Sequence, residues 1–207
     1  MGIKSFEDIS DTHLDVLKEI ANIGSGNAAS ALSRMLNHPV NVSIPYIGIK
    51  GFNDAYDALG GAEAIMVGTL LFLSSALEGM IMFLLPVEVA IDLVNMLMDT
   101  DLKTYEEIND LGFSAISEIS SIMSASFVGA IAEMSELTIE LSPPEATLDM
   151  LGSIMSVPSI YFAQMSDSLL LIQNELEIAG NTTKSSILLL PDMPSLTKLL
   201  YNLGIDA

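Results

Sequence analysis

The chain repeats one pattern of residues at a separation of 99 positions. Asp11 aligns with Asp110, Glu19 with Glu118, and Pro45 with Pro144. Between these points polar, apolar and proline positions stay in register. The repeat therefore predicts that the two halves of the chain fold alike.

Each half contains signals for the same series of elements, namely a helix, a strand, a hairpin and a second helix. β-Branched, alternating sequence follows each first helix, paired apolar runs then predict a hairpin, and each hairpin ends in Leu-Leu-Pro before another apolar helix pattern. The prolines, Pro86 and Pro191, suit the first turn of a helix. The predicted strands are residues 39–50, 64–73 and 79–85 in the first half, and 137–141, 169–178 and 185–190 in the second.

Three strands alone would leave sheet edges and an apolar face exposed, so we expect the halves to share one sheet. The predicted fold is α+β: a six-stranded, mainly antiparallel sheet with two long motif-bearing helices on one face. It forms a single domain over 1–207, built of two repeats (about 8–103 and 104–207) with internal pseudo-twofold symmetry. The segment 51–61 is expected to be an inter-strand excursion without a counterpart in the second half.

The charge balance and the apolar segments restrict the partners. Seven Lys and Arg oppose 27 Asp and Glu, and a formal charge of −20 disfavours nucleic acid and anionic membrane surfaces. The apolar stretch 68–98 is interrupted by Glu78, Pro86, Glu88 and Asp92, so we expect no membrane insertion. The absence of cysteine and of a basic leader before an apolar segment favours the cytoplasm.

Three polar residues of the first helix, Asp15, Glu19 and Asn22, fall within about 60° of one another at 100° per residue. Gly26 lies on the same stripe. The expected core face holds Val16, Leu17, Ile20, Ala21 and Ile23.

Glycine is unfavourable inside a helix, so Gly24 and Gly26 require a reason. Two interpretations stay open: close approach of another surface, or tight packing of the helix on the sheet at Gly24.

The spacing of Asp15, Glu19, Asn22 and the distant Pro45 resembles the motif of the CheC/CheX/FliY phosphatases, and the run from 19 to 29 is similar to the most characteristic segment of that family. The second copy holds Ser114, Glu118 and Pro144 at the same spacing, but Ser121 stands where the family has Asn. Two motifs in a chain of this length resemble CheC more than single-motif CheX or the longer FliY.

The resemblance implies a chemotaxis phosphatase that hydrolyses the phosphoaspartate of a CheY-like response regulator. In such a reaction the regulator holds Mg²⁺ and a lysine at the phosphoryl group, so no cofactor or metal is expected on this chain. The resemblance gives Asn22 the positioning of the attacking water and Glu19 a contact with the regulator's lysine. It makes Asp15 and Pro45 positioning residues, with Ser114 and Pro144 their counterparts.

The second site, Glu118 with Ser121, is expected to be weakened, because serine is shorter than asparagine by an amide group. Other interpretations stay open. The chain could be a weakly catalytic adaptor that sequesters the receptor deamidase CheD, or a silent structural adaptor in a flagellar switch. The polar stripes could also be solvated helix faces.

Competing chemistries have little support in the sequence. His13 and His38 are too few for a zinc site or a nucleophile–base pair, and are expected at a helix end or the surface. A glycine-rich phosphate loop with lysine is also missing.

Overall fold

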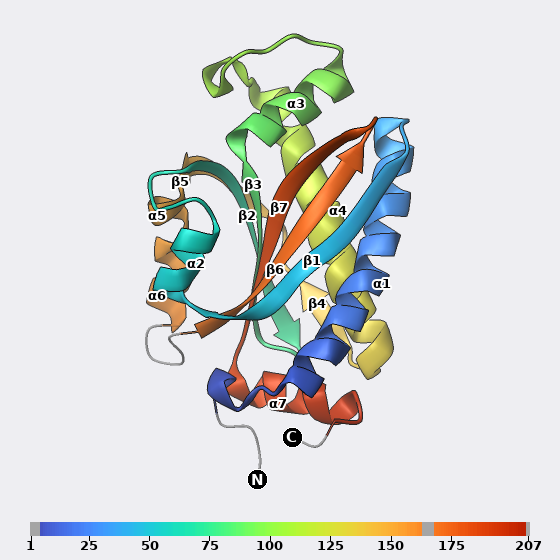
Figure 1. Ribbon diagram of the computed structural model, residues 1–207, viewed down its shortest axis with the longest axis vertical. Helices are drawn as coiled ribbons and strands as arrows, with labels where there is room; N and C mark the ends of the chain where they lie inside the picture. Colours follow the sequence, from blue (N-terminus) through green and yellow to red (C-terminus); the bar gives the residue numbers. More distant parts are fainter. Residues whose placement is uncertain (1–4, 163–167, 206–207) are drawn as a thin grey trace.

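The computed structural model describes residues 5–162 and 168–205 (Figure 1). In chain order its elements are η1 (Phe6–Asp8), α1 (Asp11–Leu36), β1 (Val40–Gly51), α2 (Phe52–Ala58), β2 (Ile65–Ser75), β3 (Gly79–Pro86), α3 (Val87–Met98), η2 (Tyr105–Glu107), α4 (Asp110–Ser135), β4 (Ile139–Leu141), β5 (Glu145–Met150), α5 (Leu151–Ile154), α6 (Ser156–Phe162), β6 (Ser168–Ile178), β7 (Asn181–Pro191) and α7 (Met193–Asn202).

One antiparallel sheet joins the two halves, in the order β1-β6-β7-β3-β2, with β4 and β5 both on the outer edge of β2. At one edge of the sheet, β1 of the first half pairs with β6 of the second half's hairpin. At the other edge, β4 and β5 of the second half pair with β2 of the first half's hairpin. β3 and β7 meet in the centre. The predicted α+β class with a mainly antiparallel sheet is confirmed, and the duplication itself stays a prediction.

The predicted count of six strands is wrong, because the described residues form a seven-stranded sheet. The additional strand arises where the outer strand of the second half is divided by Pro143 and Pro144 into β4 and β5. β1 stays continuous at the matching position, but its pairing with β6 has a bulge between Ser43 and Tyr46, around Pro45. Proline lacks the N–H that a strand ladder needs, so in each half the regular pairing of the outer strand is disturbed at the matching proline.

The segment 51–61 does have a counterpart, contrary to prediction. α2 follows β1, and α5 follows β5 at the equivalent point of the second half. Both pack on the sheet, with Ala55 of α2 and Leu151 and Ile154 of α5 buried in one cluster. The two sequences share few residue types, which hid the correspondence.

Helices cover both faces of the sheet (Figure 1). α1 and α4 lie on one face, as predicted, and bury the largest apolar cluster with Val67, Phe83 and Ile172. α2 and α5 cover the other face, where Met66 and Leu171 point. Alternation along β2 and β6 thus supplies two cores, because successive strand residues face opposite sides.

The contact between α1 and α4 depends on Gly24. A Cβ at this position would lie 2.9 Å from the Cα of Phe127 and 3.2 Å from the Ser126 carbonyl oxygen. Gly24 is therefore needed for close helix packing, but its partner is α4 and not the sheet, which one of the two open interpretations had named.

The hairpin of the second half turns more tightly than predicted. Ile178 pairs with Asn181, so only Ala179 and Gly180 form the turn, and both have positive φ angles (51° and 83°). Two positive φ angles are typical of a type I′ turn, which suits the twist of a hairpin.

The two helix prolines lie slightly before the positions predicted for them. Pro86 is the N-cap of α3, and Pro191 ends β7 before Asp192, the N-cap of α7.

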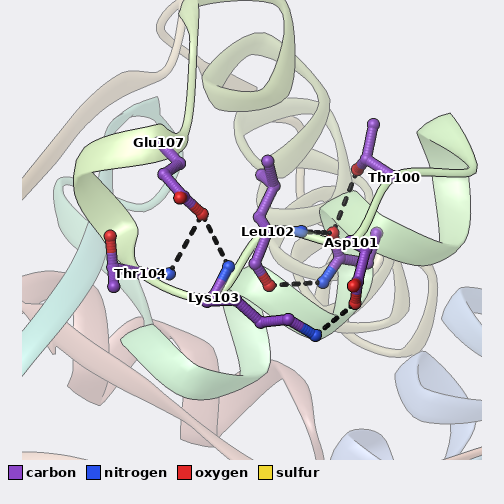
Figure 2. A network of polar contacts seen from close by, with 7 residues as sticks. Thr100, Asp101, Leu102, Lys103, Thr104 and Glu107 are labelled. Carbon is purple, nitrogen blue, oxygen red and sulfur yellow. Dashed lines mark hydrogen bonds and ion pairs between the residues drawn. The ribbon is translucent and has the colours of Figure 1, made fainter.

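The polar connection between the halves has a defined conformation (Figure 2). The Asn95 side chain at the end of α3 accepts from Leu102 N (2.7 Å) and donates to Leu102 O (3.0 Å). Glu107 Oε2 accepts from Lys103 N at 2.6 Å, and the Lys103 ammonium pairs with Asp101. These contacts hold the segment that leads into α4.

α4 is long and apolar enough to cross a membrane by length and composition alone. Half of its most apolar window is buried in the structure, where α4 packs on α1 and the sheet. The stretch 68–98 forms strand, turn, strand and helix, as predicted.

Candidate functional site

The helix that carries the first motif has a well-defined start. Ser10 caps α1: its backbone N–H donates to His13 Nδ1 (2.9 Å), and its hydroxyl accepts from His13 N (3.5 Å). This capping contact confirms His13 as a helix-end residue, although its side chain is buried. Leu17, Ile20 and Ala21 are buried on the inner side of the helix and fix its rotation.

The outer side of α1 presents the predicted polar stripe. Asp15, Glu19 and Asn22 are all exposed, together with Gly26. We call these four residues with Pro45 the Asn22 face. Within residues 5–162 and 168–205, the side chains of Glu19 and Asn22 make no hydrogen bond or ion pair, so both are available to a partner.

Gly26 differs from Gly24 in its surroundings. No atom outside its own stretch of helix lies within 4 Å of the position that a Cβ would occupy at Gly26. Packing of the described chain therefore does not require glycine there. A bare helix surface beside Asn22 favours the other interpretation, close approach of a second molecule.

A hollow of about 290 Å³ lies between α1 and β1 at one end of the Asn22 face. It brings together Asp15 of α1 and Pro45 of β1, which lie on different elements and are distant in the sequence. Its lining residues are Asp11, Leu14, Asp15, Lys18, Pro45, Tyr46 and Ile47. The structure thus gathers the four predicted motif residues of the first half on one side of the molecule.

The second motif lies on α4 and in the break between β4 and β5. Ser114, Glu118 and Pro144 are exposed, whereas Ser121 is half-buried. We call these four residues the Ser121 face. The Ser114 hydroxyl donates to Asp110 O and the Ser121 hydroxyl to Ser117 O, both at 2.8 Å. Each serine proton is thus held by the helix backbone and does not point outward.

The chemistry available on the Asn22 face is limited to hydrogen bonding and charge. Carboxylate and carboxamide groups can orient a water molecule or bind a cation, but neither is a strong nucleophile here. Within the described residues no group of three or more His, Asp or Glu side chains is placed to hold a metal ion. The face could act on a partner that supplies its own electrophile.

Sequence reasoning missed Lys18. This residue is exposed, lines the hollow, and lies one helical turn before Asn22. The helical spacing of four residues between Lys18 and Asn22 could have revealed its place beside the stripe. The absence of an ion pair at Lys18 could not have been predicted, because Asp15 lies three residues earlier on the helix and is close enough to form one.

Comparisons with known proteins agree with the motif. The sequence model of the CheC-like family matches residues 13–47, which span Asp15, Glu19, Asn22 and Pro45. The chain is 28% identical over 204 residues to the CheY-P phosphatase CheC of Bacillus subtilis (strain 168), covering 96% of this chain and 97% of CheC.

Solved structures agree with the fold. FliY of Thermotoga maritima superposes with a TM-score of 0.77 at 20% identity, covering 95% of this chain and 98% of FliY. A chain of the CheX-CheY-BeF3-Mg²⁺ complex of Borrelia burgdorferi superposes with a TM-score of 0.51 at 15% identity, covering 82% of this chain and 96% of that chain. Over residues 13–47 this chain therefore matches the CheC-like family, along almost its whole length it is similar in sequence to a CheC protein, and its fold is that of FliY.

Proposed function

We propose that this chain removes the phosphoryl group from the phosphoaspartate of a CheY-like response regulator, using the Asn22 face. The observation that carries this proposal is the pair of exposed, unbonded side chains of Glu19 and Asn22, aligned on one side of α1. The CheC relative of B. subtilis is named a CheY-P phosphatase, and a similar fold occurs in a complex with CheY.

In this mechanism a water oxygen attacks the phosphorus, and the bond between the phosphorus and the aspartyl oxygen breaks. Inorganic phosphate leaves, and the regulator's aspartate becomes a free carboxylate again. The carboxamide oxygen of Asn22 accepts a hydrogen bond from the water and holds it in line. Glu19 pairs with the regulator's active-site lysine and docks the helix. Mg²⁺ bound by the regulator stabilises the phosphoryl charge.

The Ser121 face is proposed to hydrolyse poorly. The Ser121 side chain is half-buried, and its hydroxyl donates to Ser117 O. Serine is also shorter than asparagine, so its hydroxyl would lie farther from the attacking water than the carboxamide of an asparagine. A displacement of about 1 Å can reduce a rate about a hundredfold. Glu118 keeps its exposed position and could still contact a regulator.

Phosphorylated CheY from B. subtilis is a direct probe. Loss of its phosphoryl group in Mg²⁺ should be faster with the chain present than the spontaneous decay, as measured by phosphate release. Decay at the spontaneous rate, at chain concentrations that exceed CheY, would contradict the proposed function. A small phosphate ester is unsuitable as a probe, because the regulator supplies part of the active site.

A CheD-type deamidase is the second partner that we propose. The degraded Ser121 face favours it, since a chain with one poor site could act partly by binding. Both partners would place the chain in the cytoplasm. Co-purification with CheD and retention of that complex in Asn22→Ala would support a separate adaptor role.

A further inference from the structure

Lys18 is a free cation at the edge of the Asn22 face. It is exposed on α1, it lines the hollow with Asp11 and Asp15, and within the described residues it makes no ion pair or hydrogen bond. The ion pair found in those residues joins Lys103 to Asp101 instead. Because the Lys18 ammonium forms no ion pair with these carboxylates, it can bind an anionic group of another molecule.

The surroundings of Lys18 are otherwise unfavourable for an anion. Asp11, Asp15 and Glu19 are exposed around it, and the whole chain has a formal charge of −20. α1 has one other cation, Arg34, in its last turn. A negatively charged partner that approaches Asn22 therefore meets mainly repulsion, and Lys18 is the nearest group along the helix that offsets it.

A second cation lies behind the hollow. The Lys50 ammonium is 5.7 Å from the centre of the Tyr46 ring, and Tyr46 itself lines the hollow. The ring lies over Gly48, where a Cβ would be 2.9 Å from the ring atom Cζ. Lys50 does not line the hollow, so it adds positive potential from beside Tyr46, whereas Lys18 lines the hollow and can touch a ligand.

We propose that Lys18 makes the Asn22 face selective for the phosphorylated form of its regulator. This inference rests on the proposed function. Phosphorylation adds negative charge and acceptor oxygens at the point where Asn22 would act, and a lysine on a flexible stem can bind them as a point charge. The unphosphorylated form offers Lys18 no such group. The equivalent position of the second half is Ser117, so the Ser121 face lacks this selectivity.

The test measures two affinities for each variant by calorimetry: B. subtilis CheY with Mg²⁺ alone, and the same CheY activated with beryllofluoride and Mg²⁺. Lys18→Gln should weaken binding of the activated form about five- to tenfold and of the unactivated form less than about twofold. Lys18→Arg should restore most of the difference. Lys198→Gln, an exposed lysine on α7, is the matched control and should change neither affinity.

Equal weakening of both forms in Lys18→Gln, or no weakening, would overturn the inference and leave the proposed function intact. Full turnover by Asn22→Ala would overturn the proposed site, whatever the two affinities are. If neither CheY form binds the wild-type chain, both proposals fail. Raised salt should reduce the difference between wild type and Lys18→Gln, because the added contact is electrostatic.

Discussion

Asn22 and Ser121 occupy equivalent positions of the two halves and differ in their freedom to act. Asn22 is exposed and unbonded, whereas the Ser121 hydroxyl is held by its own helix. Under the proposed function, we therefore expect the activities of the two halves to differ because of this one side chain.

Asn22→Ala should reduce turnover of phosphorylated CheY about a hundredfold or more, because the water loses its positioning group. The free energy of unfolding should change by no more than about 0.5 kcal/mol, since the side chain is exposed. Phosphate release and urea denaturation check both expectations. The matched control is Asn53→Ala, an exposed asparagine on α2, which should keep full activity.

Glu19→Ala should weaken binding of beryllofluoride-activated CheY about tenfold, because it removes the proposed contact with the regulator's lysine. Calorimetry gives the affinity directly. Glu133→Ala, an exposed glutamate near the far end of α4, serves as the control for loss of one negative charge. An unchanged affinity in Glu19→Ala would argue against a docking role.

Ser121→Asn should restore activity to the Asn22→Ala protein, by about tenfold over that variant, because it supplies the missing carboxamide next to Glu118. Phosphate release in the double variant is the measurement. If the double variant folds but stays inactive, Glu118 is structural. A large loss of activity in Ser121→Ala alone would instead show that serine already functions.

At the scale of the element, the two glycines of α1 form a matched pair. Gly24→Ala should destabilise the protein by about 1–3 kcal/mol, because the added Cβ meets the backbone of α4. Gly26→Ala should stabilise it by about 0.5–1 kcal/mol, since that site has open space and alanine favours a helix. Denaturation of the two variants tests this opposite effect. If Gly26 serves close approach of the regulator, Gly26→Ala should also weaken CheY binding.

The central strands could be predicted because both of their faces are buried. β3 is buried at every residue except Pro86, and its continuous apolar run is bounded by glycine and proline. β5 has no such signal, as each of its residues is exposed or half-buried. Its place is set by pairing with β2, a contact that local sequence does not record.

The candidate site could be predicted only in part for the same reason. Helical periodicity fixes which side of α1 Glu19 and Asn22 occupy once Leu17 and Ile20 face the core. The hollow that joins Asp15 to Pro45 arises from packing of β1 against α1. Whether Lys18 forms an ion pair also depends on side-chain conformations, which the spacing of residues does not determine.

At the scale of the whole molecule, each half pairs only the two strands of its own hairpin, and the other pairings of the described sheet join the two halves. β1 pairs with β6, and the outer edge of β2 pairs with β4 and β5. A fragment of residues 1–103 should therefore fail to fold as a monomer, because β1 and one side of β3 lack partners. Sedimentation and circular dichroism check this. A monomeric fragment with cooperative unfolding would contradict it, whereas a homodimer would agree with it.

The pairing of β1 with β6 also has a consequence for synthesis on the ribosome. β1 ends at Gly51, but β6 begins at Ser168, so the nascent β1 waits several seconds or more at roughly 5–20 residues per second. An unpaired apolar strand of this length invites association with other nascent chains. Pro45 lacks an N–H near the middle of this strand, so another chain cannot pair along its whole length, which reduces that hazard. The proline of the motif would then protect the chain before it serves the finished site.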